Sequence, residues 1–218
     1  THNCQTTGLS VDTRTLLPGN VFIALKGGRR DGHLFLAEAA SKGAVAAIVT
    51  KNYRGGSFGM KLLPVETPLT ALHDITRKML GLSSARIIAV TGSHGKTTTK
   101  DFITTLLKTK YPTASTRGNY NNNIGLPLSI AQTKGDEKYI VLEMGMNHPG
   151  EIEELVSLAP PHIAAITNIA PAHIANFSSI EDIAREKAQI LTQACTKTAF
   201  INADIPLFSE IVTHGSCK

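Results

Sequence analysis

Aromatic residues are scarce in this sequence, and tryptophan is missing altogether. Among 218 residues there are only 7 Phe and 4 Tyr. Proteins that bind single-stranded nucleic acids combine a basic groove with aromatic side chains on which the bases stack. Here the basic residues are scattered along the chain rather than gathered in one run. We therefore expect no nucleic-acid partner, although the net charge of +5 and the pI near 9.2 suit a smaller anionic ligand.

Cysteine is also scarce. The chain has Cys4, Cys195 and Cys217, which are an odd number and lie far apart, without the spacing of a metal site. Stable disulfides belong mainly to oxidising compartments. The simplest interpretation is therefore a cytoplasmic protein with reduced thiols.

Long hydrophobic runs are missing as well. No apolar run approaches the roughly 20 residues that a membrane-spanning helix needs, and the first residues lack the pattern of a signal peptide. Hydrophobic residues still make up 42% of the chain and charged residues 18%, an ordinary globular composition with enough apolar material for a core. We expect no membrane span. Since the chain begins without methionine and stops soon after a strand-like segment, we expect a fragment of a longer protein. For the oligomeric state, we expect a monomer.

The most informative stretch is an apolar run, residues 87–91, that leads through a glycine-containing turn into a helical pattern. A strand, a turn with inward-facing backbone N–H groups and a helix N-terminus together form a binding site for phosphate groups. Gly92 and Gly95 would let the backbone approach phosphate oxygens closely. Lys96 supplies a positive charge, and the Thr97 hydroxyl can bind Mg²⁺. A plain strand–turn–helix without a ligand is the alternative. The residues expected to bind a nucleotide are Gly92, Ser93, His94, Gly95, Lys96, Thr97 and Thr98.

Strand-like and helical patterns alternate along the chain, which predicts an α/β fold with a mostly parallel sheet covered on both faces. Residues 81–84 interrupt the pattern just before the phosphate-loop strand, and we place a domain boundary there. A small N-terminal domain would span 1–83, and a second domain with the phosphate loop would span 84–218. The expected strands are 21–25, 44–49, 61–65, 87–91, 138–144, 163–169 and 198–202; the expected helices are 33–42, one beginning at Pro68, 97–108, 150–158 and 180–194.

Ligands of open parallel sheets bind at the carboxyl ends of the strands, and two titratable residues are expected there. Glu143 closes an apolar strand, where a carboxylate suits a Mg²⁺ ion or a water-positioning role; capping a neighbouring helix is the alternative. His173 follows the apolar run 163–169. For this histidine a ligand role and a hydrogen-bonded structural role remain equally open.

Lys187 lies on the apolar stripe of its predicted helix, four residues after Ile183 and four before Leu191. A lysine on a core-facing line is rarely buried unless it is paired. Either its amine reaches past the edge of the core to water, or it reaches a charged site under the sheet edge. In the second case desolvation would lower its pKa and provide a reactive neutral amine.

Two polar loops are further candidates for ligand binding. Residues 26–32 form a basic, glycine-containing loop that suits a diphosphate, with a solvated loop as the alternative. Residues 117–127 include four asparagines within five positions, 119–123. Their amides offer donors and acceptors for a polar substrate, although asparagine is also a common turn residue.

Taken together, these stretches resemble the Mur ligases, the ATP-dependent amide ligases of bacterial cell-wall synthesis. The resemblance extends over nearly the whole chain. That family also lacks the glycine that a strict phosphate-loop motif would have at Val90. The motifs that carry the resemblance are residues 12–14, 18–27, 31–33, 91–98, 118–127, 143–152 and 167–173, together with the helix of Lys187.

The resemblance implies roles for individual residues. Residues 92–98 would bind ATP. Thr97 and Glu143 would hold one Mg²⁺ ion, and His173 would help to hold a second. Lys187 matches a lysine that in many members is carbamylated by CO₂ into a metal ligand. The implied catalytic residues are Lys96, His173 and Lys187, and the implied substrate-binding residues are Thr13, Arg14, Lys26, Asn119, Asn121 and Asn122.

The resemblance also implies a reaction. ATP would phosphorylate the terminal carboxylate of UDP-N-acetylmuramoyl-tripeptide, held by domain 1–83, and the amine of D-Ala-D-Ala would attack the acyl phosphate. Relatives continue through the rest of the central domain and a third, dipeptide-binding domain, so we expect this piece to be inactive alone. The alternatives are a sister ligase that adds a single amino acid, a phosphotransferase or NTPase with a phosphate loop, and a non-catalytic module that binds a UDP-sugar.

Overall fold

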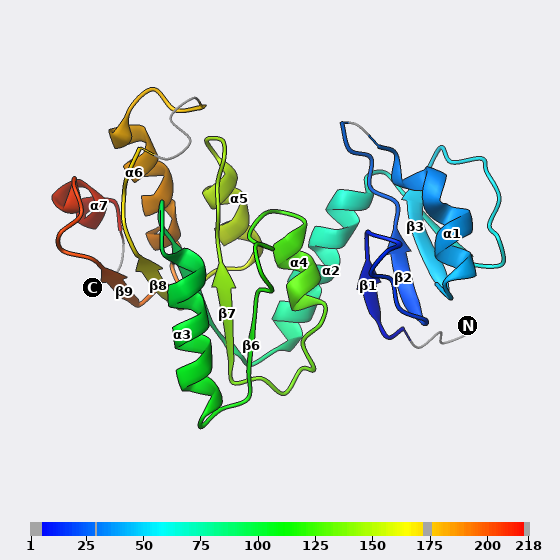
Figure 1. Cartoon of the computed structure of the whole chain (residues 1–218), viewed down its shortest axis with the longest axis horizontal. Coiled ribbons are helices and arrows are strands. Elements are labelled where there is room, and N and C mark those ends of the chain that lie inside the picture. Colours follow the sequence, from blue (N-terminus) through cyan, green and yellow to red (C-terminus); the bar gives the residue numbers. More distant parts are fainter. Residues whose placement is uncertain (1–5, 29, 172–175, 216–218) are drawn as a thin grey trace. The chain divides into compact units, whose positions relative to one another are not determined.

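The structure, a computed structural model, describes residues 6–28, 30–171 and 176–215 (Figure 1). The chain forms two compact units, Thr1–Thr76 and Arg77–Lys218, and the division falls inside helix α2 (Pro68–Leu82). The functional division that we expected, 1–83 and 84–218, stays a prediction. Among the described residues, none of the helices combines the length and the apolar composition needed to cross a bilayer.

The first unit contains a four-stranded parallel sheet. The strands follow one another in space as they do in sequence, β1-β2-β3-β4. Its core consists mainly of apolar residues from β2, β3 and α1, among them Phe22, Ala47 and Leu36. The bounds are β1 Gly8–Ser10, β2 Asn20–Ile23, the 3₁₀ helix η1 Gly32–Phe35, α1 Leu36–Ser41, β3 Ala46–Thr50 and β4 Lys61–Val65.

The second unit contains a five-stranded parallel sheet in the order β6-β7-β5-β8-β9. The parallel α/β class that the alternation predicted is confirmed. The strands are β5 Arg86–Thr91, β6 Thr113–Ser115, β7 Tyr139–Glu143, β8 Ile163–Ile166 and β9 Thr198–Ile201; the helices are α3 Lys96–Lys108, α4 Gly125–Ile130, α5 Glu151–Leu158, α6 Ile180–Ala188, the 3₁₀ turn η3 Gln189–Leu191, and α7 Phe208–His214.

Helices cover both faces of this second sheet. Alternate residues of β5 point to opposite sides, and the apolar side chains on each side pack against helices. Ile88 and Val90 pack with Ile103 of α3 on one face. Ile87 and Ala89 belong to a larger core on the other face, which α4, α5 and α6 complete. Figure 1 shows α3 running alongside β7. The apolar run of β5 thus reflects burial on both faces, as parallel strands require.

Several elements were not expected from the sequence: β1, β6, α4 and α7. The two strands have three residues each, too few for an alternating pattern. Every residue of α4 is buried, so it has no amphipathic stripe, and its Gly125 and Pro127 look like turn residues. Pro127 is tolerated because it stands in the first turn, where its missing N–H has no partner to lose.

Two expected elements end earlier than predicted. The helix expected over 180–194 ends as an α-helix at Ala188 and continues as the 3₁₀ turn η3, whose buried Ile190 and Leu191 prolong the apolar pattern. The strand expected to reach residue 169 ends at Ile166. Beyond it, Thr167 and Asn168 turn their polar groups to the loop after β5.

Candidate functional site

The candidate site lies where the carboxyl ends of three neighbouring strands meet. β5 is the central strand, with β7 on one side and β8 on the other, and the register puts Val90 beside Glu143 and Thr91 beside Ile166. The chain runs from β5 through α3 and β6 to β7 and then crosses to β8 on the opposite side. Ligands of open parallel sheets bind at such a reversal of strand order.

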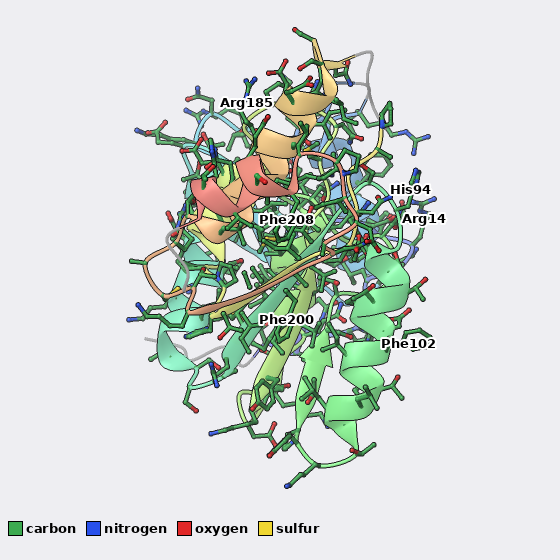
Figure 2. The ribbon with its side chains drawn as sticks, turned by 90° about the vertical axis from the view of Figure 1, so that its left-hand side faces the viewer. Arg14, His94, Phe102, Arg185, Phe200 and Phe208 are labelled. Atoms are coloured by element: carbon green, nitrogen blue, oxygen red, sulfur yellow. The ribbon has the colours of Figure 1, made fainter. Side chains whose placement is uncertain are left out.

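The loop between β5 and α3, residues 92–95, has the backbone of a phosphate-binding turn. Gly92 and Gly95 have φ values of +149° and +77°, and Gly95 is the cap of α3. Such angles favour glycine. Figure 2 shows His94 of this loop just above the upper end of α3. Because α3 begins at Lys96, its first N–H groups and the positive end of its dipole lie at the loop.

The end of β8 holds this loop in place. Thr167 Oγ1 donates to the carbonyl of His94 at 2.6 Å, and Asn168 Oδ1 accepts from the His94 N–H at 3.0 Å. Ser93 Oγ donates to the carbonyl of Ala170 at 2.9 Å. No role was predicted for Thr167 or Asn168. Both follow a buried strand, so the rule that selected Glu143 would have selected them too.

Replacing Gly92 with alanine is expected to abolish nucleotide binding, because an added Cβ would lie 2.0 Å from Thr167 Oγ1 at a φ that alanine rarely adopts. Isothermal titration with Mg·ATP would measure this loss. The matched control is Gly81→Ala, since Gly81 is inside α2 and a Cβ added there would meet nothing within 4 Å. That variant should bind as the wild type does and gain up to about 1 kcal/mol of stability. Unchanged binding by Gly92→Ala would contradict the prediction.

Lys96 folds back over its own loop. Its Nζ donates to the carbonyls of Gly92 at 2.8 Å and Ser93 at 3.3 Å. Burial lowers the pKa of Lys96, and the negative charge of Glu143 opposes that change. The amine is therefore held in the loop, partly desolvated, where added negative charge would stabilise it.

Glu143 is 2% exposed at the end of β7. Its Oε2 accepts from Thr97 Oγ1 at 2.7 Å, its Oε1 accepts from Asn121 Nδ2 at 2.8 Å, and its backbone N–H donates to Thr116 Oγ1 at 3.0 Å. In the described part of the chain, the observed donors to the carboxylate are thus side chains and not helix N–H groups. The capping alternative therefore has no hydrogen bond to support it among the described residues, and the metal-binding role of Glu143 stays a prediction.

Lys187 is 2% exposed, so the interpretation in which its amine reaches past the core to water is wrong. The reason is that α6 packs tightly: Ile183 and Ala184, one turn earlier, are also buried. The pKa of Lys187 is lowered to about 7, mainly by burial and also by the positive charge of Lys96, while the negative charge of Glu186 acts in the opposite direction. The two amines are therefore near enough for their charges to repel each other.

Glu186 cannot fully neutralise the charge of Lys187, because its carboxylate accepts hydrogen bonds from another helix. It accepts from the N–H groups of Gly150 and Ile152, both at 2.9 Å, at the beginning of α5. A helix N-terminus is a favourable place for negative charge. The carboxylate therefore fastens α6 to α5, and its hydrogen bonds go to α5 rather than to the Lys187 amine.

The side chains at the strand ends fit a Mg²⁺ ion. Mg²⁺ is usually bound by one or two carboxylates together with phosphate oxygens and water. Glu143 and Thr97 offer a carboxylate and a hydroxyl of this kind. Thr91, at the end of the adjacent strand β5, has a buried Oγ1 without a hydrogen-bond partner among the described residues. No group of three or more His, Cys, Asp or Glu side chains suited to a metal was found in the described residues. His173 lies outside them, so its role stays a prediction.

The asparagine loop divides between local and long-range contacts. Asn121 reaches Glu143 through its amide. Asn122 Oδ1 accepts from the N–H groups of Ile124 and Gly125, at 3.2 and 2.8 Å. This is the turn-forming role of asparagine, the alternative to substrate binding. Asn119 is exposed at the loop surface. The substrate-binding roles of Asn119, Asn121 and Asn122 stay predictions.

The predicted substrate residues of the first unit follow two adjacent parallel strands, β1 and β2. Thr13 is buried, and its carbonyl accepts from Lys42 Nζ at 2.8 Å. Arg14 binds the carboxylate of Asp12 with two nitrogens, and this hydrogen bonding lowers the pKa of Asp12. Lys26 is exposed in the loop after β2. Because β1 and β2 are parallel, all three residues follow the carboxyl ends of strands at the same end of the sheet, where ligands often bind. A substrate role stays a prediction for all three.

A family model described as the Mur ligase middle domain matches residues 90–218. The UDP-N-acetylmuramoyl-tripeptide–D-alanyl-D-alanine ligase of Rickettsia prowazekii is 37% identical over 212 residues, which are 97% of this chain and 46% of that protein. The ligase of the same name from Bacillus subtilis is 41% identical over 184 residues, 84% of this chain and 40% of that protein. The chain thus spans less than half the length of these two relatives.

Solved structures that are similar to this chain include two of proteins named MurF. A crystal structure of MurF from Acinetobacter baumannii superposes with a TM-score of 0.90 at 31% identity, over 100% of this chain and 48% of that chain. MurF from Thermotoga maritima in complex with ADP gives a TM-score of 0.85 at 34% identity, over 100% of this chain and 51% of that chain.

Proposed function

The chain belongs to the Mur ligase family, and from this premise we propose that it carries the nucleotide- and UDP-substrate-binding parts of an ATP-dependent amide ligase. The ligase would join D-Ala-D-Ala to UDP-N-acetylmuramoyl-tripeptide in the cytoplasm, during synthesis of the peptidoglycan precursor. The relatives that bear this activity in their names support the proposal over 84% and 97% of the chain.

The observation that carries the proposal is the meeting of a phosphate loop with a buried carboxylate. Lys96, the first residue of α3, turns its amine back onto the loop, and Thr97, the next residue, donates to Glu143 at the tip of the neighbouring strand. ATP would lie against residues 92–98, with the N–H groups of the loop and of α3 on its phosphates. The ADP complex of the Thermotoga relative supports a nucleotide at this fold.

Glu143 and Thr97 would hold Mg²⁺, with His173 and a carbamylated Lys187 as the ligands of a second ion. Bound there, Mg²⁺ would neutralise charge on the phosphates of ATP. The chain's own part is to supply Lys96 as a fixed charge that offsets repulsion between ATP and an incoming carboxylate. Lys187, with a pKa of about 7, provides the neutral amine that reaction with CO₂ requires.

The reaction has two balanced steps. A carboxylate oxygen of the tripeptide takes the terminal phosphoryl group of ATP, and ADP leaves. The amine of D-Ala-D-Ala then attacks the acyl carbon, phosphate leaves with the electron pair of the broken bond, and the amine loses a proton. Residues Thr13, Arg14 and Lys26 would bind the UDP end, and Asn119 and Asn122 would contact the peptide, so the protein mainly positions its reactants.

ADP release by the full-length protein that contains this chain tests the proposal. With UDP-N-acetylmuramoyl-tripeptide present, release should require D-Ala-D-Ala and should not occur with single amino acids. Added bicarbonate should raise the rate of the wild type but not that of Lys187→Ala, in which no carbamate can form. The 218-residue chain alone should bind ATP without steady turnover.

Other results would point to other functions. Release with a single amino acid would identify a sister ligase, and release without any acceptor would identify an NTPase. A module that only binds a UDP-sugar would show no release at all and would keep its ligand when Lys96 is replaced by alanine. Each of these results contradicts the proposal.

A further inference from the structure

Asn121 lies in a polar loop but directs its side chain to the inside of the second unit. Its Nδ2 donates to Glu143 Oε1 at 2.8 Å. A carboxylate only accepts hydrogen bonds, so the contact fixes which end of the amide faces Glu143. The residue is only partly exposed, whereas its neighbours Tyr120 and Asn122 are exposed.

The backbone around Asn121 is tied to the same strand tip. Its carbonyl accepts from the N–H of Gly145 at 2.8 Å, two residues after Glu143. A Cβ added at Gly145 would lie 2.7 Å from Asn121 Nδ2. The amide therefore packs directly on the chain that follows β7, in space that only glycine leaves open.

Glu143 is consequently held from two sides. Thr97 donates to Oε2 and Asn121 donates to Oε1. A carboxylate at the end of a side chain can rotate, and a ligand that must rotate into place loses affinity for the ion. With Oε1 engaged by the amide, Oε2 is left at the phosphate loop, beside the hydroxyl of Thr97.

We propose that Asn121 is a positioning residue: it orients the carboxylate of Glu143 for a divalent cation at the phosphate loop. The proposal rests on the proposed function, because it needs a cation between Glu143 and a bound nucleotide. It gives Asn121 a different role from the substrate contact that the sequence suggested. Since a hydrogen-bonded neighbour of a metal ligand typically changes metal affinity by 10–100-fold, the effect should be measurable.

The test is a Mg²⁺ titration of ATP binding by the 218-residue chain, read by a fluorescent ATP analogue. Asn121→Ala and Asn121→Leu both remove the donor, and the leucine keeps the volume. Each should raise the Mg²⁺ concentration for half-maximal binding roughly 10-fold. Affinity for the analogue in EDTA should not change. Gln132→Ala, an exposed amide of the same unit, is the control and should behave as the wild type.

A double-mutant cycle separates positioning from a general structural role. In a Glu143→Gln background, Asn121→Ala should have no further effect on the Mg²⁺ dependence, since the two residues act as one unit. Penalties that add, or a Mg²⁺ dependence unchanged in both single variants, would overturn the inference while leaving the proposed function standing. Loss of the folded state in both variants, seen by circular dichroism, would also overturn it. A wild-type chain that binds no ATP would contradict both.

Discussion

Replacing Lys96 with alanine is expected to weaken ATP binding by this chain roughly 100-fold, a loss of about 3 kcal/mol. The amine folds back onto the loop, and among the described residues its hydrogen bonds go to the carbonyls of Gly92 and Ser93. A triphosphate in the loop would give this charge its strongest partner. Titration calorimetry with Mg·ATP would measure the change.

The same variant should not destabilise the fold. Burial lowers the pKa of Lys96, which means that the folded chain holds the charge at a cost. Removing the amine should leave the free energy of unfolding unchanged or slightly higher. Lys108→Ala, at the exposed last turn of α3, is the control and should alter neither property. Binding within threefold of the wild type would mean that residues 92–98 do not hold the phosphates.

Replacing Lys187 with methionine is expected to stabilise the apo chain at pH 6 and to abolish ligase activity in the full-length protein. Methionine is apolar and similar in length, so it fills the same space without a charge. The pKa of Lys187 falls from 10.5 to about 7 in the fold, which corresponds to at most about 5 kcal/mol of stability. The activity loss follows from the amine that the carbamate would need.

The pH dependence gives this prediction its sign. Between pH 7 and 10.5 the unfolded chain keeps the proton on Lys187 while the folded chain has lost it. The free energy of unfolding of the wild type should therefore rise with pH across this window. Below about pH 7 both states are protonated and the full penalty remains. In Lys187→Met this contribution should be absent.

Urea unfolding in EDTA at pH 6, 7, 8 and 9 would measure both effects, with Lys108→Met as an exposed control. EDTA is needed because bound cations would shift the same equilibrium. If Lys187→Met is less stable than the wild type at pH 6, or if its stability rises with pH as steeply, then Lys187 is charged and well solvated in the fold. The burial argument would then fail.

Two neighbouring asparagines show what sequence patterns cannot predict, namely the direction of a side chain in a loop. Asn121 and Asn122 are adjacent and chemically identical, and no sequence pattern distinguishes one from the other. In the structure one amide reaches Glu143 and the other caps a turn at Gly125. The direction of a side chain in a loop depends on backbone angles that no periodicity encodes.

Local chemistry determined much of this protein before any fold was known. The glycines of residues 92–95, followed by Lys96 and Thr97, indicate phosphate binding because the required groups are neighbours in the sequence. The apolar run of β5 and the helical spacing around Lys187 likewise depend on residues a few positions apart. Patterns of this short range predicted the parallel α/β class and the unusual place of Lys187.

Only the tertiary structure decided which distant groups meet. The strand order β7-β5-β8 brings Glu143 and Thr167 to the loop from opposite sides, although they lie 46 residues after Thr97 and 73 residues after His94. The burial of Lys187 and its pKa near 7 arise from the packing of α6 on the sheet and from the charge of Lys96. Charges and hydrogen bonds act through space, so their partners are set by the sheet order and by helix packing, which a linear pattern does not contain.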